Sequence, residues 1–238
     1  MSTFVLVHGA FSGAWCWERV VHQLEELGHK VVAVNLPSHG NDGIAPSTVT
    51  LEQYVEYLRY IVSKERGEVI LVGHSLGGIV ISQTAESIPS KITKLVYVAA
   101  LLPQSGQSFM ELNERNQKAL PLPITVSEDQ GHFKLDINNI RENFYGETQE
   151  EDYLFAKEKH CDQPLAPFIT PVSLTQKNYG SISRVYIETL KDKSLSHEFQ
   201  REMITHMPCD EVHSLDSDHS PFFSKTEELV QLLHSLAE

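Results

Sequence analysis

The five residues Gly73-His74-Ser75-Leu76-Gly77 match the G-x-S-x-G pattern of a nucleophile elbow, in which a serine stands on a tight turn between a strand and a helix. Such a turn is strained, and its glycines let neighbouring backbone come close. The helix that follows points its N-terminus at the site, where the helix dipole favours negative charge. We therefore expect Ser75 to be a nucleophile rather than an idle serine in a glycine-rich turn.

A serine hydroxyl is a poor nucleophile without a general base, and the chain has 12 histidines. The base of such a site follows the last strand, which is where His219 lies. His213 falls inside the strand pattern, so it is expected to be packed or at the surface. Three histidines in early turns or beside the nucleophile are expected to hold loops by hydrogen bonds: His8, His39 and His74. The remaining histidines are expected to be solvated.

The base needs a carboxylate that fixes its tautomer and stabilises the imidazolium. The expected chain order is serine, acid, histidine, and Asp192 lies just after a strand between the two. Asp216 and Asp218 are rival candidates. They share a loop with His219, however, and residues so close in sequence rarely reach the far nitrogen of the ring.

Ester chemistry at a serine also needs two backbone N–H donors for the oxyanion. The residue after the nucleophile, Leu76, is expected to supply one of them. The other is expected from the loop after the first strand, which reads His8-Gly9-Ala10-Phe11-Ser12-Gly13, and we select Ala10. The alternative is that this loop is a plain glycine turn.

Hydrophobic periodicity predicts the elements that position these residues. Six strands are expected at residues 3–7, 30–34, 69–72, 94–99, 184–190 and 211–215, with helices at 15–27, 51–67, 76–88, 196–204 and 225–236. This alternation predicts an α/β fold: a mostly parallel six-stranded sheet of order 2-1-3-4-5-6 with helices on both faces. The core is assigned to residues 1–102 and 181–238. Residues 103–180, polar and rich in proline, are expected to form a mostly helical inserted lid over the carboxyl ends of the strands.

The composition of the chain limits the classes of binding partner that we expect. The 238-residue chain has 19 basic and 32 acidic residues, for a net charge of −13, which argues against nucleic acid and anionic membrane as partners. No apolar run is long enough to span a bilayer, and no signal peptide is seen. The three cysteines fit no zinc spacing, so we expect free thiols, a cytoplasmic location and neither metal nor cofactor. The oligomeric state is left open, a homodimer included.

Several segments resemble the plant methyl esterase and hydroxynitrile lyase family of α/β-hydrolases and its bacterial relatives, esterases that act on salicylate-type aromatic esters and on pyrethroid esters. They are residues 4–10 (FVLVHGA), 13–17 (GAWCW), 69–78 (VILVGHSLGG), 184–187 (RVYI), 192–193 (DK), 198–200 (EFQ) and 218–219 (DH). The insertion is similar only around residues 144–146 (FYG).

Within this family three positions separate esterases from lyases. The best-known lyases carry threonine, cysteine and lysine where this chain has Gly9, Leu76 and Ser220, and the lysine supplies positive charge for departing cyanide. This chain has none of the three, and a glycine at position 9 leaves room for a tetrahedral intermediate. The resemblance therefore implies an esterase.

The expected reaction is hydrolysis of a small-molecule ester. Ser75 attacks the carbonyl, His219 passes the serine proton to the leaving alcohol, and water cleaves the acyl-enzyme. Phe11, Phe144 and Phe168 are candidate substrate-binding residues, each also a typical core residue, and they favour small apolar or aromatic esters of the methyl-ester type. Two alternatives stay open: a lyase using the same triad, and a non-catalytic receptor that binds small molecules.

Overall fold

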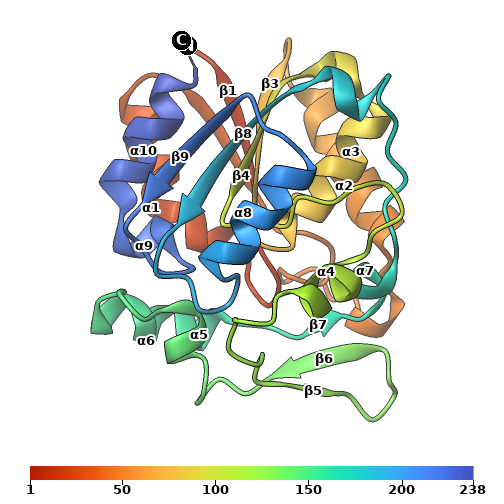
Figure 1. Cartoon of the computed structure of the whole chain (residues 1–238), viewed down its shortest axis with the longest axis vertical. Helices are drawn as coiled ribbons and strands as arrows, with labels where there is room; N and C mark the ends of the chain where they lie inside the picture. The colour runs from red at the N-terminus through yellow and green to blue at the C-terminus, as the bar shows by residue number, and fades with distance from the viewer. Residues whose placement is uncertain (238) are drawn as a thin grey trace.

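The computed structural model describes residues 1–237 and is built around a six-stranded sheet whose neighbouring strands all run parallel (Figure 1). In sheet order the strands are β2 (Lys30–Val34), β1 (Thr3–Val7), β3 (Val69–His74), β4 (Ile92–Val98), β8 (Ser183–Thr189) and β9 (Glu211–Leu215). This is the predicted order, and the first two crossovers diverge from β1 as expected. Ligands bind at the carboxyl ends of strands next to such a divergence.

The central strands are buried apolar runs because helices cover both faces of the sheet. All six residues of β3 are buried, whereas only one of the five residues of the edge strand β2 is. In β1, Val5 pairs with Val32 on one side and Leu71 on the other. The predicted strand at 69–72 extends two residues further, to His74, which brings the strand directly up to Ser75.

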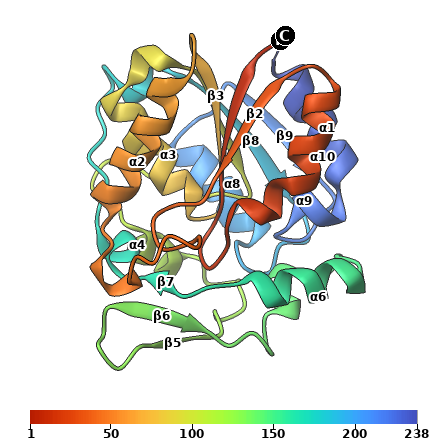
Figure 2. The same ribbon diagram turned by 180° about the vertical axis from the view of Figure 1, so that it is seen from behind.

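Helices lie on both sides of the sheet, as Figures 1 and 2 show. One face is covered by α1 (Glu18–Glu26), α9 (Pro221–Ser224) and α10 (Thr226–Ser235), and the other by α2 (Leu51–Lys64), α3 (Gly77–Ser87) and α8 (His197–His206). The helix expected at 15–27 begins instead with a 3-10 turn, Ala14–Trp17. The start of α2 is fixed by a capping box, in which the Thr50 hydroxyl accepts from the Gln53 N–H and the Gln53 side chain accepts from the Thr50 N–H.

The segment between β4 and β8 lies below the carboxyl ends of the strands (Figure 1). It holds α4 (Phe109–Arg115), α5 (Arg141–Phe144), α6 (Glu150–Lys159) and α7 (Ala166–Ile169), together with an antiparallel sheet of β5 (Ile124–Val126), β6 (His132–Leu135) and β7 (Gln163–Pro164). The expectation of a mostly helical insertion missed this sheet. Its strands are two to four residues long, too short to show a period, and the turn between β5 and β6 sets their pairing, with the Ser127 N–H donating to His132 O at 2.9 Å.

Within residues 1–237, no helix combines the length and the hydrophobicity needed to cross a membrane. All three cysteines, Cys16, Cys161 and Cys209, are free thiols, as the sequence predicted.

Candidate active site

The turn that carries Ser75 has the strained geometry expected of a nucleophile elbow. Ser75 has a φ of +51°, a left-handed conformation that is uncommon for a residue with a side chain. A Cβ at Gly73 would lie 2.7 Å from the Gly77 carbonyl oxygen, and a Cβ at Gly77 would lie 2.9 Å from that of Val7. Both glycines are therefore required by close backbone packing around the serine.

The histidine and the acid meet although they are 27 residues apart in the chain. His219 Nδ1 lies 2.7 Å from Asp192 Oδ2, and both side chains are buried. The other oxygen, Asp192 Oδ1, accepts from the N–H groups of Ser194 and Leu195, each at 2.8 Å. Because a carboxylate only accepts, Nδ1 carries the proton and Nε2 is left to accept one.

The two rival acids have other partners. Asp216 pairs with Lys191 at 3.0 Å, on the exposed side of the loop. Asp218 is buried and accepts from the Glu147 N–H and the Thr148 hydroxyl, both at 2.9 Å. Asp192 is therefore the carboxylate that meets His219, and Asp218 instead joins the loop of the base to the insertion.

The early histidines hold loops, as the sequence predicted. His8 Nδ1 donates to Gly9 O at 2.7 Å, while its Nε2 accepts from the Leu36 N–H at 3.1 Å. His39 Nδ1 donates to Ser12 O at 2.8 Å. His74 Nε2 donates to the backbone carbonyl of His219 at 2.8 Å and so fixes the position of the base. Burial, followed by the nearby His219, lowers the pKa of His74 well below its ordinary value, so this ring is neutral.

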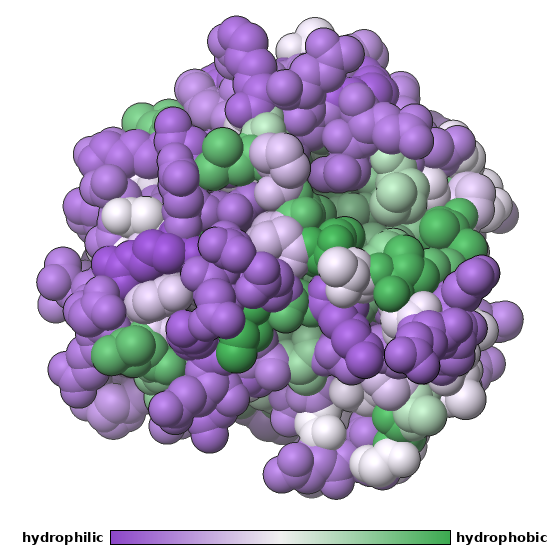
Figure 3. All heavy atoms as spheres, turned by 90° about the horizontal axis from the view of Figure 1, so that it is seen from below, coloured by the Kyte–Doolittle hydropathy of each residue, from purple (hydrophilic) through white to green (hydrophobic). Residues whose placement is uncertain are grey.

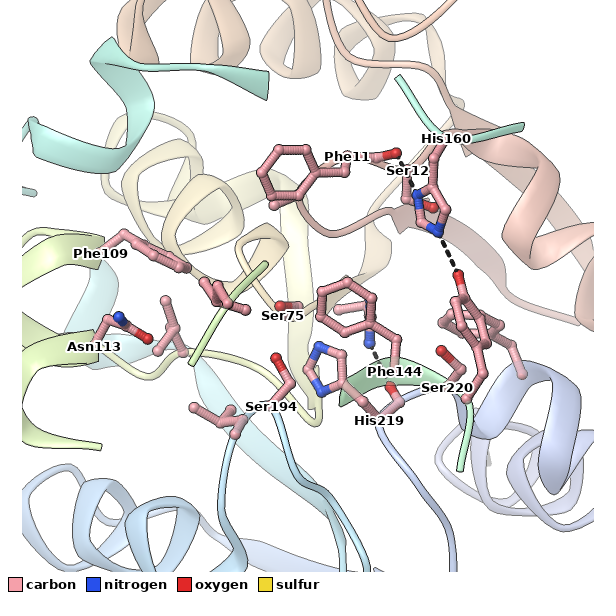
Figure 4. A pocket seen from close by; sticks show the side chains of 17 residues that line it. Phe11, Ser12, Ser75, Phe109, Asn113, Phe144, His160, Ser194, His219 and Ser220 are labelled. Carbon is pink, nitrogen blue, oxygen red and sulfur yellow. Dashed lines mark hydrogen bonds between the residues drawn. The ribbon is translucent and has the colours of Figure 1, made fainter. Parts of the chain in front are cut away.

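Ser75 and His219 both line a cavity of about 620 Å³, counting its open mouth (Figure 4). About half of the lining residues are apolar, among them Phe11, Leu101, Phe109, Leu122, Phe144 and Phe222. From the insertion side, the surface is largely hydrophilic, with a hydrophobic strip near the middle of the view (Figure 3).

Of the three predicted substrate-binding residues two, Phe11 and Phe144, line the cavity, and so does Ala10, the predicted oxyanion donor. Phe168 does not; it is fully buried and stacks on Phe109, with ring centroids 3.9 Å apart, so it forms a second layer behind the wall. The side chain of Leu76 is buried too. Its expected role as an oxyanion donor depends on its backbone N–H, which lies at the N-cap of α3.

His160 is a site residue that the sequence analysis missed, since it was grouped with the solvated histidines. It lies partly buried in the cavity wall, where its Nδ1 donates to Phe11 O at 2.7 Å and its Nε2 accepts from the Tyr145 hydroxyl at 2.8 Å (Figure 4). Burial lowers its pKa to about 4. Its neighbours in the chain, Glu-Lys on one side and Cys-Asp on the other, give no sign of this burial. His29 and His132 are also largely buried, contrary to expectation.

The features that distinguish lyases are missing here in space as well as in sequence. A Cβ at Gly9 would lie 2.8 Å from both Ser75 Cβ and His74 Nδ1, so a larger residue would crowd the nucleophile. Ser220, at the position of the lyase lysine, lines the cavity and is buried. Among the described residues that line the cavity there is no lysine or arginine. In residues 1–237, no group of three or more His, Cys, Asp or Glu side chains is placed to hold a metal ion.

Comparison with known proteins gives one family. The model of the alpha/beta hydrolase family matches residues 4–232. Methylesterase 9 of Arabidopsis thaliana is 35% identical, and the match covers 100% of this chain and 99% of that protein. Putative methylesterase 11, chloroplastic, of the same plant is 37% identical, but the chain spans only 63% of its length.

Solved structures agree with this assignment. Tomato methylketone synthase I superposes with a TM-score of 0.90 at 29% identity, covering 99% of this chain and 97% of that one. A pyrethroid hydrolase from Sphingobium faniae JZ-2 gives 0.89 at 31% identity, with the same coverage of both chains. Their names differ in the reaction, so the fold alone does not choose the chemistry. The chain belongs to the alpha/beta hydrolase family, within which its relatives include methylesterases.

Proposed function

We propose that this protein is a serine carboxylesterase that hydrolyses small apolar or aromatic esters of the methyl-ester type. The observation that carries the proposal is the His219–Asp192 pair at 2.7 Å, whose histidine lines the same cavity as Ser75 on its strained elbow. Relatives named methylesterases, at about one third identity over the whole chain, support ester hydrolysis as the type of reaction.

In the proposed mechanism, His219 Nε2 accepts the proton of the Ser75 hydroxyl as the serine attacks the ester carbonyl. Asp192 holds the ring in the tautomer with a proton on Nδ1 and stabilises the imidazolium that forms. The backbone N–H groups of Ala10 and Leu76 bind the oxyanion. His219 then protonates the leaving alcohol, and a water activated by the same ring cleaves the acyl-enzyme.

The lining of the cavity supports the substrate class. Phe11, Phe109 and Phe144 offer aromatic surface to an acyl group. The described lining residues include no lysine or arginine that could pair with a substrate carboxylate. A neutral ester with an apolar acyl part fits this lining better than a charged one. The insertion supplies Phe109 and Phe144, and we propose that it acts as the lid that selects the acyl group.

The test is a panel of methyl, ethyl and aryl esters given to the purified protein, beside mandelonitrile and a serine-directed phosphonate. We expect turnover of apolar or aromatic esters, little or no cleavage of mandelonitrile, and stoichiometric labelling of Ser75. Mandelonitrile cleavage without ester turnover would instead indicate a lyase. Ligand binding with no turnover of either substrate would indicate a receptor.

A further inference from the structure

The residue after the proposed oxyanion donor is held in an unfavourable conformation. Phe11 follows Ala10 and has a φ of +59°, in the left-handed region where a bulky side chain is a genuine outlier. Such a conformation persists only where the surroundings hold it in place, and it is typical of functional sites. What holds Phe11 therefore also sets the path of the backbone at Ala10.

The hydrogen bonds of the Phe11 backbone come from one short stretch of the insertion. Its N–H donates to Gln163 Oε1 at 3.3 Å. Its carbonyl accepts from the Cys161 N–H at 3.1 Å and from His160 Nδ1 at 2.7 Å. The Gly9 carbonyl accepts from His8, and the Ser12 carbonyl accepts from His39 and, at 3.7 Å, from the Cys161 thiol. The strained residue is thus the main point at which the insertion holds the loop.

His160 is itself well fixed. Its Nε2 accepts from Tyr145 Oη at 2.8 Å (Figure 4). Its ring also lies edge-on to Trp15, with centroids 5.4 Å apart. Because burial keeps the ring neutral, it has one N–H, and the carbonyl of Phe11 takes it. The shortest hydrogen bond to Phe11 is therefore made by a side chain with little freedom to turn away.

We propose that His160 is a positioning residue, which holds the Ala10 N–H, through Phe11, where the oxyanion of the intermediate forms. This inference rests on the proposed esterase function. It assigns the insertion a part in the chemical step besides substrate selection. Because the oxyanion exists only in the transition state and intermediate, loss of His160 should lower kcat far more than it raises KM.

The experiment compares three variants of the full chain. His160→Phe keeps a planar ring but removes the N–H, and His160→Asn keeps an N–H close to the place of Nδ1. His29→Phe is the matched control, because His29 is also a buried histidine but lies before β2, at the opposite end of the sheet. Each is measured for ester kinetics, for thermal stability, and for amide hydrogen exchange in a peptide spanning residues 8–13.

We expect His160→Phe to lower kcat by about 10–100-fold with KM within about threefold, and to speed exchange in the 8–13 peptide. His160→Asn should recover most of kcat, and His29→Phe should change neither. If His160→Phe does not fold, His160→Leu, which is smaller and also lacks the N–H, takes its place.

A folded variant without the N–H but with normal kcat and normal exchange would overturn the proposal. So would an equal loss in His29→Phe, or an effect on KM alone. If the wild-type protein turns over no ester, the proposed function fails, whereas the exchange measurement still decides whether His160 holds the loop.

Discussion

The core and the insertion contribute to the same cavity but differ in the extent of their apolar packing. The proposed triad comes from the ends of three parallel strands, with Ser75 after β3, Asp192 after β8 and His219 after β9. Two large apolar clusters, one on each face of the sheet, fix those strands. The insertion adds Phe109, Leu112, Phe133, Phe168 and Val172 to one of these clusters, and around residues 140–156 it forms a small apolar cluster of its own.

Besides this packing, polar contacts tie residues 147–152 of the insertion to the core. Asp218 accepts from the Glu147 N–H and the Thr148 hydroxyl, and Arg19 pairs with Asp152. Such contacts contribute less than a packed core and depend more on geometry. Substitutions in the core should therefore act in an all-or-none manner on chemistry or on folding. Substitutions in the insertion should act in a graded manner on the substrate and on the oxyanion loop.

The largest expected effect is in the core. Ser75→Ala should lower ester turnover by about 10⁴–10⁶-fold with the melting temperature almost unchanged, because a single hydroxyl carries the covalent step. The double variant Ser75→Ala with His219→Ala should be barely worse than either single one, since the triad acts as a unit. Steady-state kinetics and phosphonate labelling measure this, and a strictly multiplicative loss would contradict it.

Substitutions at the two buried aspartates, Asp192 and Asp218, allow a direct comparison of the core with the contact to the insertion. Asp192→Asn should cost about 10⁴-fold in kcat, because the amide favours the wrong tautomer of His219. Asp218→Asn removes an acceptor that binds the insertion, so about tenfold or less is expected. Both are read from kcat at saturating ester. If Asp218→Asn proved the more severe of the two, the assignment of the acid would be wrong.

Alanine substitutions at Gly78 and Gly146 compare how closely the core and the insertion are packed. A Cβ at Gly78, in α3, would collide with the Leu101 carbonyl oxygen, so Gly78→Ala should destabilise the fold by about 3 kcal/mol. At Gly146, in the insertion, the nearest atom to a Cβ is Glu142 O at 4.0 Å, so Gly146→Ala should change stability by about 0.5 kcal/mol or less. Urea unfolding of both variants tests this, and equal effects would show that the difference in packing does not decide the outcome.

The last effect, smaller per side chain than that at Gly78, concerns acid stability. Burial lowers the pKa of His39 and of His160 to about 4 in the folded protein. Between pH 6.5 and 4 the unfolded chain binds more protons at these sites, so the free energy of unfolding should fall as pH falls, by about 2 kcal/mol per histidine from pH 7 to 5. Urea midpoints at the two pH values measure it. His160→Asn should show a shallower dependence, and a slope equal to that of the wild type would contradict the assignment to His160.

The sequence by itself determined the sheet and the identity of the reacting groups. Apolar runs such as residues 3–7 and 30–34 predict buried strands, and alternation with helices leaves few topologies, so the strand order could be derived. Motif and chain order then indicated Ser75, Asp192 and His219, because each follows a strand whose end lies at the same edge. Local geometry, such as the need for glycine at positions 73 and 77, is also encoded locally.

Only the tertiary structure decided the rest, because it depends on contacts between segments with no local signature. The three-stranded sheet of the insertion is set by the pairing of very short strands. Phe168 lies behind the cavity wall, where it stacks on Phe109. The sequence alone does not show whether a phenylalanine lines a cavity or packs behind its lining. His160 lies in a polar stretch of the chain, yet its ring enters the cavity wall and donates to the carbonyl of Phe11, 149 residues earlier.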